Sequence, residues 1–218
     1  MAKELISDLC FTPDGTTLAV ASHDNIIYLL SYRGPTDLQP RARCRGHSSY
    51  VSNISINDEG KWMMSNDGAG EIMYWDIQTG DQETRIDKVK SARWFPNTCP
   101  MSWSTQGIWP KEGDLTDVNA CMQRGVGTSG MEGPAGYGMV VTADDFGKVK
   151  LFNSPSLQWC APHMVHRGHS SHVTNVCFNA DGTRVISVGG NDRCAFVWRV
   201  IQVNEGANGG SFGLEGKE

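Results

Sequence analysis

A ten-residue stretch that occurs three times decides the fold. It reads ISDLCFTPDG at residues 6–15, VSNISINDEG at residues 51–60 and VTNVCFNADG at residues 173–182. Each copy has apolar residues at its first, fourth and sixth positions and a glycine at its tenth. A degenerate copy starts at Val89 and keeps the apolar spacing without the glycine. The period of about 42 residues is typical of stacked β units such as propeller blades.

Two of the copies lie inside longer units with matched ends. Gly46-His47 precedes the second copy, and Gly168-His169 precedes the third. The same two units close on Trp75-Asp76 and Trp198-Arg199. A Gly-His opening and a Trp-Asp close resemble the WD repeat, whose blades have four strands. Because no helical periodicity is sustained along the chain, the sequence predicts an all-β fold, a WD-repeat β-propeller.

The repeat predicts about five blades within residues 1–203. They span about residues 5–32, 46–80, 84–110, 117–156 and 168–203. We expect a Pro- and Arg-containing connection at 33–45, a glycine-rich loop insertion at 123–138 and a flexible Gly-rich tail at 204–218. Five open blades would expose strand edges. The rest of the propeller is therefore expected to come from the same longer chain or from another chain.

Composition indicates a packed soluble protein. Of the 218 residues, 39% are hydrophobic, and the formal net charge of −5 argues against broad binding to nucleic acid or anionic membranes. We see no secretory signal and no apolar run long enough to cross a bilayer. The seven cysteines are scattered and form no Cys-x-x-Cys pair, which is the pattern of reduced thiols in a cytosolic core.

Two blades contain a His, a Ser and a Trp in the same order. The residues predicted to form a structural blade network are His47, Ser65, Trp75, Asp76, His169, Ser187, Asp192 and Trp198. A Ser-His-Asp hydrolase is the alternative. We favour the structural reading, because a catalytic site has no reason to recur from blade to blade, whereas buried polar groups must be satisfied locally. Ala69 takes the place of Asp192 before Trp75, and Asp67 lies two residues earlier, so that set is expected to be incomplete.

Two further motifs suggest other chemistry. Asp145-Phe146-Gly147 matches the magnesium-binding tripeptide of kinases, but it lacks the companion kinase loops and fits a turn between strands better. His166, His169 and His172 suggest a metal cluster, but no cysteine or carboxylate set completes four ligands. The sequence therefore predicts no catalytic residue, no metal and no cofactor.

Partner contacts are expected on the rims of the blades, through loops 33–45, 111–116 and 123–138. The candidate partner-binding residues are Arg41, Arg43, Arg45 and Trp109. The arginines are either a solvated loop or a contact for an acidic surface. Trp109, like Trp103 and Trp159, is either a partner hot spot or part of the packing between blades.

Longer segments carry a resemblance to one family. They are Ser22–Tyr28, Met64–Asp76, Gly107–Pro110 with Thr116–Asn119, Ala143–Phe152 and His169–Val176. Over roughly residues 5–203 the chain resembles the C-terminal part of an echinoderm microtubule-associated protein-like (EML) protein. The Gly-Ile-Trp-Pro and Ala-Asp-Asp-Phe segments are more specific for this family than the general Trp-Asp signature.

The resemblance implies that the chain is the end of the second of two joined propellers. It implies a non-catalytic scaffold that binds tubulin, microtubules or axonemal proteins, located on microtubules in the cytoplasm or on the axoneme of a cilium. The chain shows no heptad region and no basic arm. The alternative is a general WD-repeat adaptor in a complex unrelated to microtubules, because a fold does not fix a function.

Overall fold

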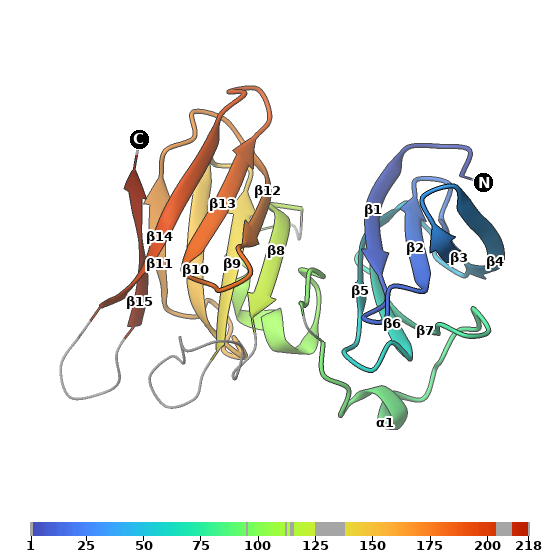
Figure 1. Ribbon diagram of the computed structural model, residues 1–218. Coiled ribbons are helices and arrows are strands. Elements are labelled where there is room, and N and C mark those ends of the chain that lie inside the picture. The colour runs from blue at the N-terminus through green and yellow to red at the C-terminus, as the bar shows by residue number, and fades with distance from the viewer. Residues whose placement is uncertain are drawn as a thin grey trace. The chain divides into compact units, whose positions relative to one another are not determined.

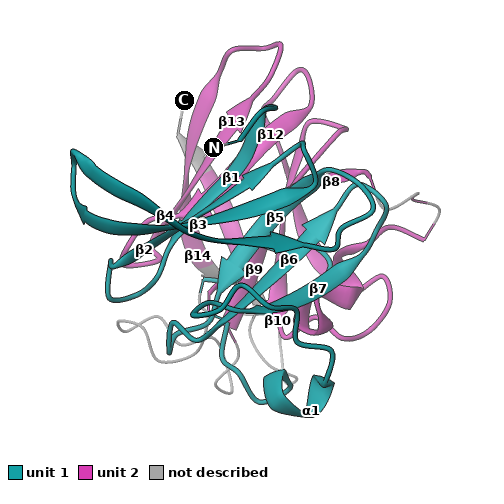
Figure 2. Ribbon diagram, turned by 90° about the vertical axis from the view of Figure 1, so that its right-hand side faces the viewer, with its two compact units in different colours: residues 1–101 teal, residues 102–218 magenta. Residues whose placement is uncertain are grey.

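The computed structural model describes residues 2–94, 96–111, 113, 116–124, 138–203 and 211–217. These residues form four antiparallel sheets with very little helix, which confirms the predicted all-β propeller fold (Figure 1). The chain divides into two compact units, residues 1–101 and 102–218, which Figure 2 draws in teal and magenta. Among the described helices, none combines the length and apolar character needed to span a bilayer.

The first unit starts with a complete four-stranded blade, blade 1. Its strands are β1 (Ile6–Phe11), β2 (Thr17–Ser22), β3 (Ile26–Gly34) and β4 (Asp37–Arg45), in that spatial order. The turn after β1 contains Gly15 at φ +69°, a conformation that only glycine adopts without strain. Residues 37–45, predicted as part of a connection, instead pair with β3 along its length and form the outer strand.

Blade 2 follows with three strands. They are β5 (Val51–Ile56), β6 (Trp62–Asp67) and β7 (Ile72–Asp76), again in sequence order across the sheet. The turn between β5 and β6 uses Gly60 at φ +68°, at the same repeat position as Gly15 of blade 1. The conserved spacing of the repeat therefore places the same backbone conformation at the same point of both blades.

Residues 84–110 do not form the third blade that the repeat predicts. The segment contains a four-residue helix α1 (Ile86–Val89), an isolated bridge between Asn57 and Trp94, and a 3₁₀ helix η1 (Trp103–Ile108) that belongs to the second unit. Pro96 and Pro100 lack the backbone N–H that a central strand needs. The apolar spacing of the repeat is present in this segment, but the turn residues that connect the strands of a blade are missing.

Residues 96–101 instead lie along blade 2 and form hydrogen bonds with it. The side-chain amide of Asn66 donates to the Met101 carbonyl at 2.9 Å and accepts from the Met101 N–H at 2.9 Å. The Ser55 hydroxyl donates to the Pro96 carbonyl at 2.8 Å, and the Thr98 hydroxyl donates to the Ile54 carbonyl at 2.9 Å. The buried side chains of Ser55 and Asn66 therefore have their hydrogen-bond partners in a segment that is not a strand.

The core of the first unit lies between blades 1 and 2. The small residues Ala19 and Ala21 of β2 share a buried cluster with Ile54 and Trp75 of blade 2. The inner strand β5 contacts both β1 and β2. The hydroxyl of Ser7, at a β-bulge of β1, donates to the Val51 carbonyl at the start of β5.

The second unit contains blades 3 and 4, each with four strands. Blade 3 has β8 (Val118–Arg124), β9 (Gly138–Asp144), β10 (Lys148–Ser154) and β11 (His163–Arg167), and blade 4 has β12 (Val173–Phe178), β13 (Arg184–Gly189), β14 (Ala195–Val203) and β15 (Ser211–Lys217). Part of the predicted Gly-rich tail is thus the outer strand of blade 4, paired with β14. Of the predicted insertion 123–138, residues 125–137 lie outside the described residues.

The two blades of this unit pack as blades 1 and 2 do. Val141 and Ala143 of β9 share a buried cluster with Val176, Phe178 and Trp198 of blade 4. Asn119, at the β-bulge of β8, donates its side-chain amide to the Val173 carbonyl at 2.9 Å. A bulge residue therefore links the inner strands of neighbouring blades in both units.

Candidate functional site

Blade 4 holds the predicted network in full. The indole N–H of Trp198 donates to the Ser187 hydroxyl oxygen at 2.8 Å, and Ser187 lies 2.9 Å from Nε2 of His169. His169 Nδ1 lies 2.7 Å from a carboxylate oxygen of Asp192. Because Nδ1–H donates to the carboxylate, Nε2 is the acceptor and the serine O–H points to it.

The serine, histidine and aspartate are bonded in the same order as in a hydrolase triad, but the serine hydroxyl lies in a position that does not suit catalysis. Ser187 is fully buried, and its oxygen already accepts the N–H of Trp198. A nucleophile must reach a substrate carbonyl, and this hydroxyl has no path to solvent. The arrangement satisfies buried polar groups between strands β13 and β14.

Blade 2 has a similar network, which is less complete than that of blade 4 because His47 Nδ1 makes no hydrogen bond. His47 Nε2 lies 2.6 Å from the Ser65 hydroxyl, which also accepts the indole N–H of Trp75 at 2.8 Å. The carboxylate is supplied by Asp67, whose Oδ2 lies 3.2 Å from His47 Nδ1. Asp67 is the last residue of β6, whereas Asp192 lies in the turn after β13. The two blades thus bring a carboxylate close to the histidine from different positions of the repeat.

Asp67 also organises the turn that follows β6. Its carboxylate accepts the backbone N–H groups of Ala69 at 3.0 Å, Glu71 at 2.8 Å and Ser49 at 3.2 Å. Burial by itself raises the pKa of Asp67, but these hydrogen bonds outweigh it, so the pKa lies below the usual 3.8. Burial also lowers the pKa of His47 below 6.5, although Asp67 favours its charged form.

These two shifts predict that acid weakens the first unit in two steps. The unfolded chain protonates His47 at a higher pH than the folded chain does, so stability is complete above about pH 6.5 and falls below it. The lowered pKa of Asp67 adds stability that is present above about pH 3.8 and is lost as the pH falls through the folded value. Urea unfolding between about pH 7.5 and pH 5 measures the first step. His47→Gln should flatten it, and an unchanged slope in that variant would contradict the assignment to His47.

Blade 3 carries a reduced version of the network. Thr142 and Phe152 stand where the other blades have serine and tryptophan, as the strand pairings show. The carboxylate here is Asp144, which forms an ion pair with Lys150 at 2.8 Å and accepts the N–H groups of Phe146 and Lys148. The Asp145-Phe146-Gly147 motif is the turn between β9 and β10, with Gly147 at φ +71°.

Two groupings considered from the sequence do not form: the expected place of Asp76 in the blade network, and the histidine cluster that the sequence already argued against. Asp76 accepts the N–H groups of Gln78 at 2.8 Å and Thr79 at 3.2 Å, so it holds the turn after β7 and is not part of the His-Ser-Trp network. The three histidines of the suggested metal cluster have separate partners. His166 bonds to Leu214, His169 to Ser187 and Asp192, and His172 to Ser171.

A group of three possible metal donors occurs instead at the blade 2 network. One atom each of His47, Asp67 and Glu71 lies within 4.8 Å of the others. His47 Nε2 is engaged by Ser65, and Nδ1 faces carboxylate oxygens of Asp67 at 3.2 Å and Glu71 at 3.8 Å without a hydrogen bond. Both carboxylates already accept backbone N–H groups, Asp67 from Ala69 and Glu71 from Ser48, so the turn itself accounts for their placement.

The candidate arginines lie on the outer strand β4. Arg41 donates to the Thr17 hydroxyl at 3.2 Å and to the Ile77 carbonyl, so it ties blade 1 to blade 2. Arg43 lies over the ring of Tyr28, with 5.5 Å from its guanidinium carbon to the ring centroid. Arg43 and Arg45 are exposed and form no ion pair within the described residues.

The candidate tryptophans differ sharply in exposure. Trp109 is only 5% exposed, so the structure places it in packing and corrects its assignment as a partner contact. Trp103 and Trp159 are 73% and 55% exposed. Exposed aromatic residues are the ones that serve as interface anchors.

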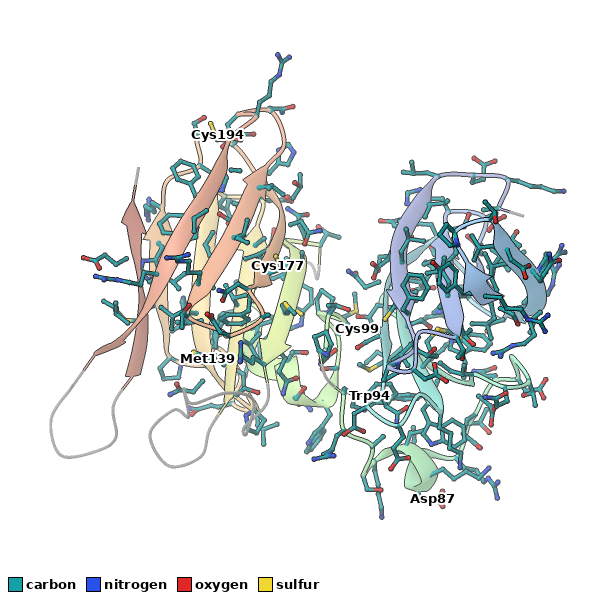
Figure 3. The ribbon with its side chains drawn as sticks, in the orientation of Figure 1. Asp87, Trp94, Cys99, Met139, Cys177 and Cys194 are labelled. Atoms are coloured by element: carbon teal, nitrogen blue, oxygen red, sulfur yellow. The ribbon has the colours of Figure 1, made fainter. Side chains whose placement is uncertain are left out.

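The seven cysteines are all free thiols. Burial raises the pKa of Cys44 to about 12 and that of Cys10 to about 11, which keeps both thiols protonated and unreactive. Cys177 is exposed on β12, and Cys194 lies at the turn between β13 and β14 (Figure 3).

The chain matches known proteins over nearly its whole length. Residues 1–200 match the family model of the echinoderm microtubule-associated protein second β-propeller. The chain is 39% identical to rat echinoderm microtubule-associated protein-like 2 over 199 residues, which are 91% of this chain and 29% of the relative. Human echinoderm microtubule-associated protein-like 3 and mouse echinoderm microtubule-associated protein-like 1 are each 36% identical over 91% of this chain, and the match covers 21% and 23% of their lengths.

Proposed function

We propose that the chain is a non-catalytic scaffold that holds tubulin, microtubules or axonemal proteins, because it belongs to the echinoderm microtubule-associated protein-like family. It corresponds to the second β-propeller of that family. The match of residues 1–200 to this propeller carries the proposal. The chain spans less than a third of the length of the curated relatives it matches. Binding by the whole protein is therefore part of the proposal.

The buried networks support a scaffold without catalysis. Blade 4 contains a hydroxyl, an imidazole and a carboxylate in series, and a similar series occurs in blade 2. The serines of the two series, Ser187 and Ser65, are fully buried. Such networks rigidify the blades and so hold the exposed edges at fixed positions. A rigid scaffold with exposed edges suits the binding of protein partners.

Arg43 and Arg45 are the proposed contacts for an acidic protein surface. They project from an outer strand, and neither is neutralised by a carboxylate in the described part of the chain. The net charge of −5 opposes long-range attraction to acidic partners, so local contacts must carry the binding. Trp103 and Trp159 add exposed aromatic surface.

Microtubule co-sedimentation tests this function. Residues 1–218 and the longer parent protein are each pelleted with microtubules at low and moderate salt. We expect both to pellet, and Arg43→Gln with Arg45→Gln to weaken binding by roughly fivefold, as for the loss of two exposed ion pairs. The matched control is Lys90→Gln with Arg184→Gln, which removes the same charge elsewhere.

The outcomes separate the alternatives. If only the parent protein pellets, the lattice contact lies outside these residues and this chain is an adaptor part of a microtubule protein. Recovery of a stable complex without tubulin from cells would favour the general adaptor. Location on the axoneme is tested by imaging the tagged parent protein in ciliated cells.

We further propose that another blade of the longer protein covers one face of blade 1. The apolar repeat positions of its inner strand, Ile6, Leu9 and Phe11, are 48–57% exposed. The same positions in blades 2 and 4 are only 0–6% exposed, because the preceding blade covers them. They are Val51, Ile54 and Ile56 in blade 2 and Val173, Val176 and Phe178 in blade 4.

A pair of truncations tests this coverage. In residues 1–218, Leu9→Ala should change the free energy of unfolding by less than about 0.5 kcal/mol, as for a surface site. Ile54→Ala should cost about 2–4 kcal/mol, because the residue is buried. In the longer parent protein, Leu9→Ala should approach the cost of Ile54→Ala. An equally small cost there would show that no blade covers this face.

A further inference from the structure

The second unit contains a cavity of about 580 Å³ with an unusual lining. Five of its lining residues are basic or imidazole groups: Lys148, Lys150, His163, His166 and Arg167. None of the lining residues is acidic, although the whole chain has a net charge of −5. We call this cavity, together with strand β11, the basic groove.

Two of the cations have no protein counter-ion. Lys150 is neutralised by Asp144 at 2.8 Å, where the carboxylate is buried. Lys148 and Arg167 are direct partners across the antiparallel pair of β10 and β11. Within the described residues neither forms an ion pair with a carboxylate. Like charges directly opposite on neighbouring strands repel each other and destabilise the sheet. An anion bound between them would reduce this repulsion.

The imidazoles of His163 and His166 add hydrogen-bonding groups to the lining. His166 Nε2 accepts the backbone N–H of Leu214 at 3.1 Å, which places its proton on Nδ1. His163 Nδ1 lies 2.8 Å from the Ala161 carbonyl and donates to it, so Nε2 is left as its second polar atom. These rings supply polar contacts beside the two free cations without adding a competing negative charge.

Strand β11 gives the groove a second property. It lies at the end of the sheet order β11-β10-β9-β8, so one of its edges pairs with no strand in the described part of the chain. An unpaired edge offers backbone N–H and C=O groups that an extended polypeptide can pair with. A small anion or a nucleic acid would leave those groups unused.

We propose that the basic groove binds an extended acidic peptide segment. Its backbone pairs with the free edge of β11, and its carboxylates contact Lys148 and Arg167. Charge complementarity selects acidic side chains, and the free strand edge selects a polypeptide. This site is separate from Arg43 and Arg45 on β4, and it stands whether or not microtubules are the partner of the whole protein.

A fluorescent polyglutamate peptide of about ten residues is the probe, long enough to run along the edge of one strand. Its binding to residues 1–218 is measured by fluorescence anisotropy. We expect Lys148→Gln with Arg167→Gln to weaken binding by about fivefold, and Lys148→Arg with Arg167→Lys to restore it. We expect the affinity of the unmodified protein to fall with added salt.

The matched control is Lys90→Gln with Arg184→Gln, which makes the same charge change at two exposed positions outside both proposed binding sites. Equal weakening by both variants would show that only the net charge matters, and this would overturn the proposal. Binding of inorganic phosphate at millimolar concentration without any binding of the peptide would assign the cavity to a small anion and overturn it as well. Circular dichroism of the Gln variants confirms that the fold is intact.

Discussion

Replacing Trp75 with alanine should lower the free energy of unfolding by about 3–5 kcal/mol, the usual cost of removing a large buried aromatic side chain. Trp75 is 1% exposed and packs in the core between blades 1 and 2. The change also removes the N–H that bonds to Ser65. Urea unfolding followed by far-UV circular dichroism measures the loss, and hydrogen exchange should locate it to strands β5–β7.

A conservative change separates the two contributions. Trp75→Phe keeps most of the ring but removes the N–H, and it should cost about 1–2 kcal/mol. Blade 3 already uses Phe152 at this position, so phenylalanine is compatible with a blade. A loss below about 1 kcal/mol for Trp75→Ala would show that this core does not depend on the tryptophan.

Replacing Asp67 with alanine should cost about 3 kcal/mol, because it leaves three part-buried backbone N–H groups without their acceptor and removes the carboxylate that faces a buried histidine. The N–H groups of Ser49, Ala69 and Glu71 bond to this carboxylate, and Nδ1 of His47 lies 3.2 Å from it. The sequence pattern alone points to Ala69 as the network position and gives no reason to expect a large effect at Asp67.

Two control variants make the result specific. Asp67→Asn keeps one acceptor oxygen for the turn but loses the charge that faces His47, so it should cost about half as much as Asp67→Ala. Asn53→Ala changes a partly exposed residue on the neighbouring strand β5 and should stay within about 0.5 kcal/mol. If Asp67→Ala were no worse than Asn53→Ala, the carboxylate would not be part of a buried network.

Much of this architecture is predictable from the sequence, because the inner strands carry the repeat. The apolar positions that begin at Val51 and Val173 mark strands that are buried between blades, so burial enforces the pattern. The His-Ser-Trp sets are also visible from spacing. Asp67 is missed because the polar network is defined in space, and either a strand end or a turn can bring a carboxylate to the histidine.

The outer strands are not predictable in this way. Strand β4 contains Pro40 and alternates exposed arginines with small residues, and β15 is rich in glycine. An outer strand obtains its hydrogen bonds from one neighbour and needs little apolar surface, so its sequence resembles a loop. The segment 84–110 shows the opposite error, because its apolar spacing predicts a strand at Ser91–Trp94, where the structure has a turn after α1 and an isolated bridge at Trp94.

The links between inner strands have a consequence for how the protein is made. The Ser7–Val51 hydrogen bond joins residues 44 positions apart, and the Asn119–Val173 bond joins residues 54 positions apart. Each bond lies within one compact unit, so its formation does not require residues of the other unit. Each pair of blades can therefore fold as soon as its own residues leave the ribosome, while later parts of the chain are still being synthesised.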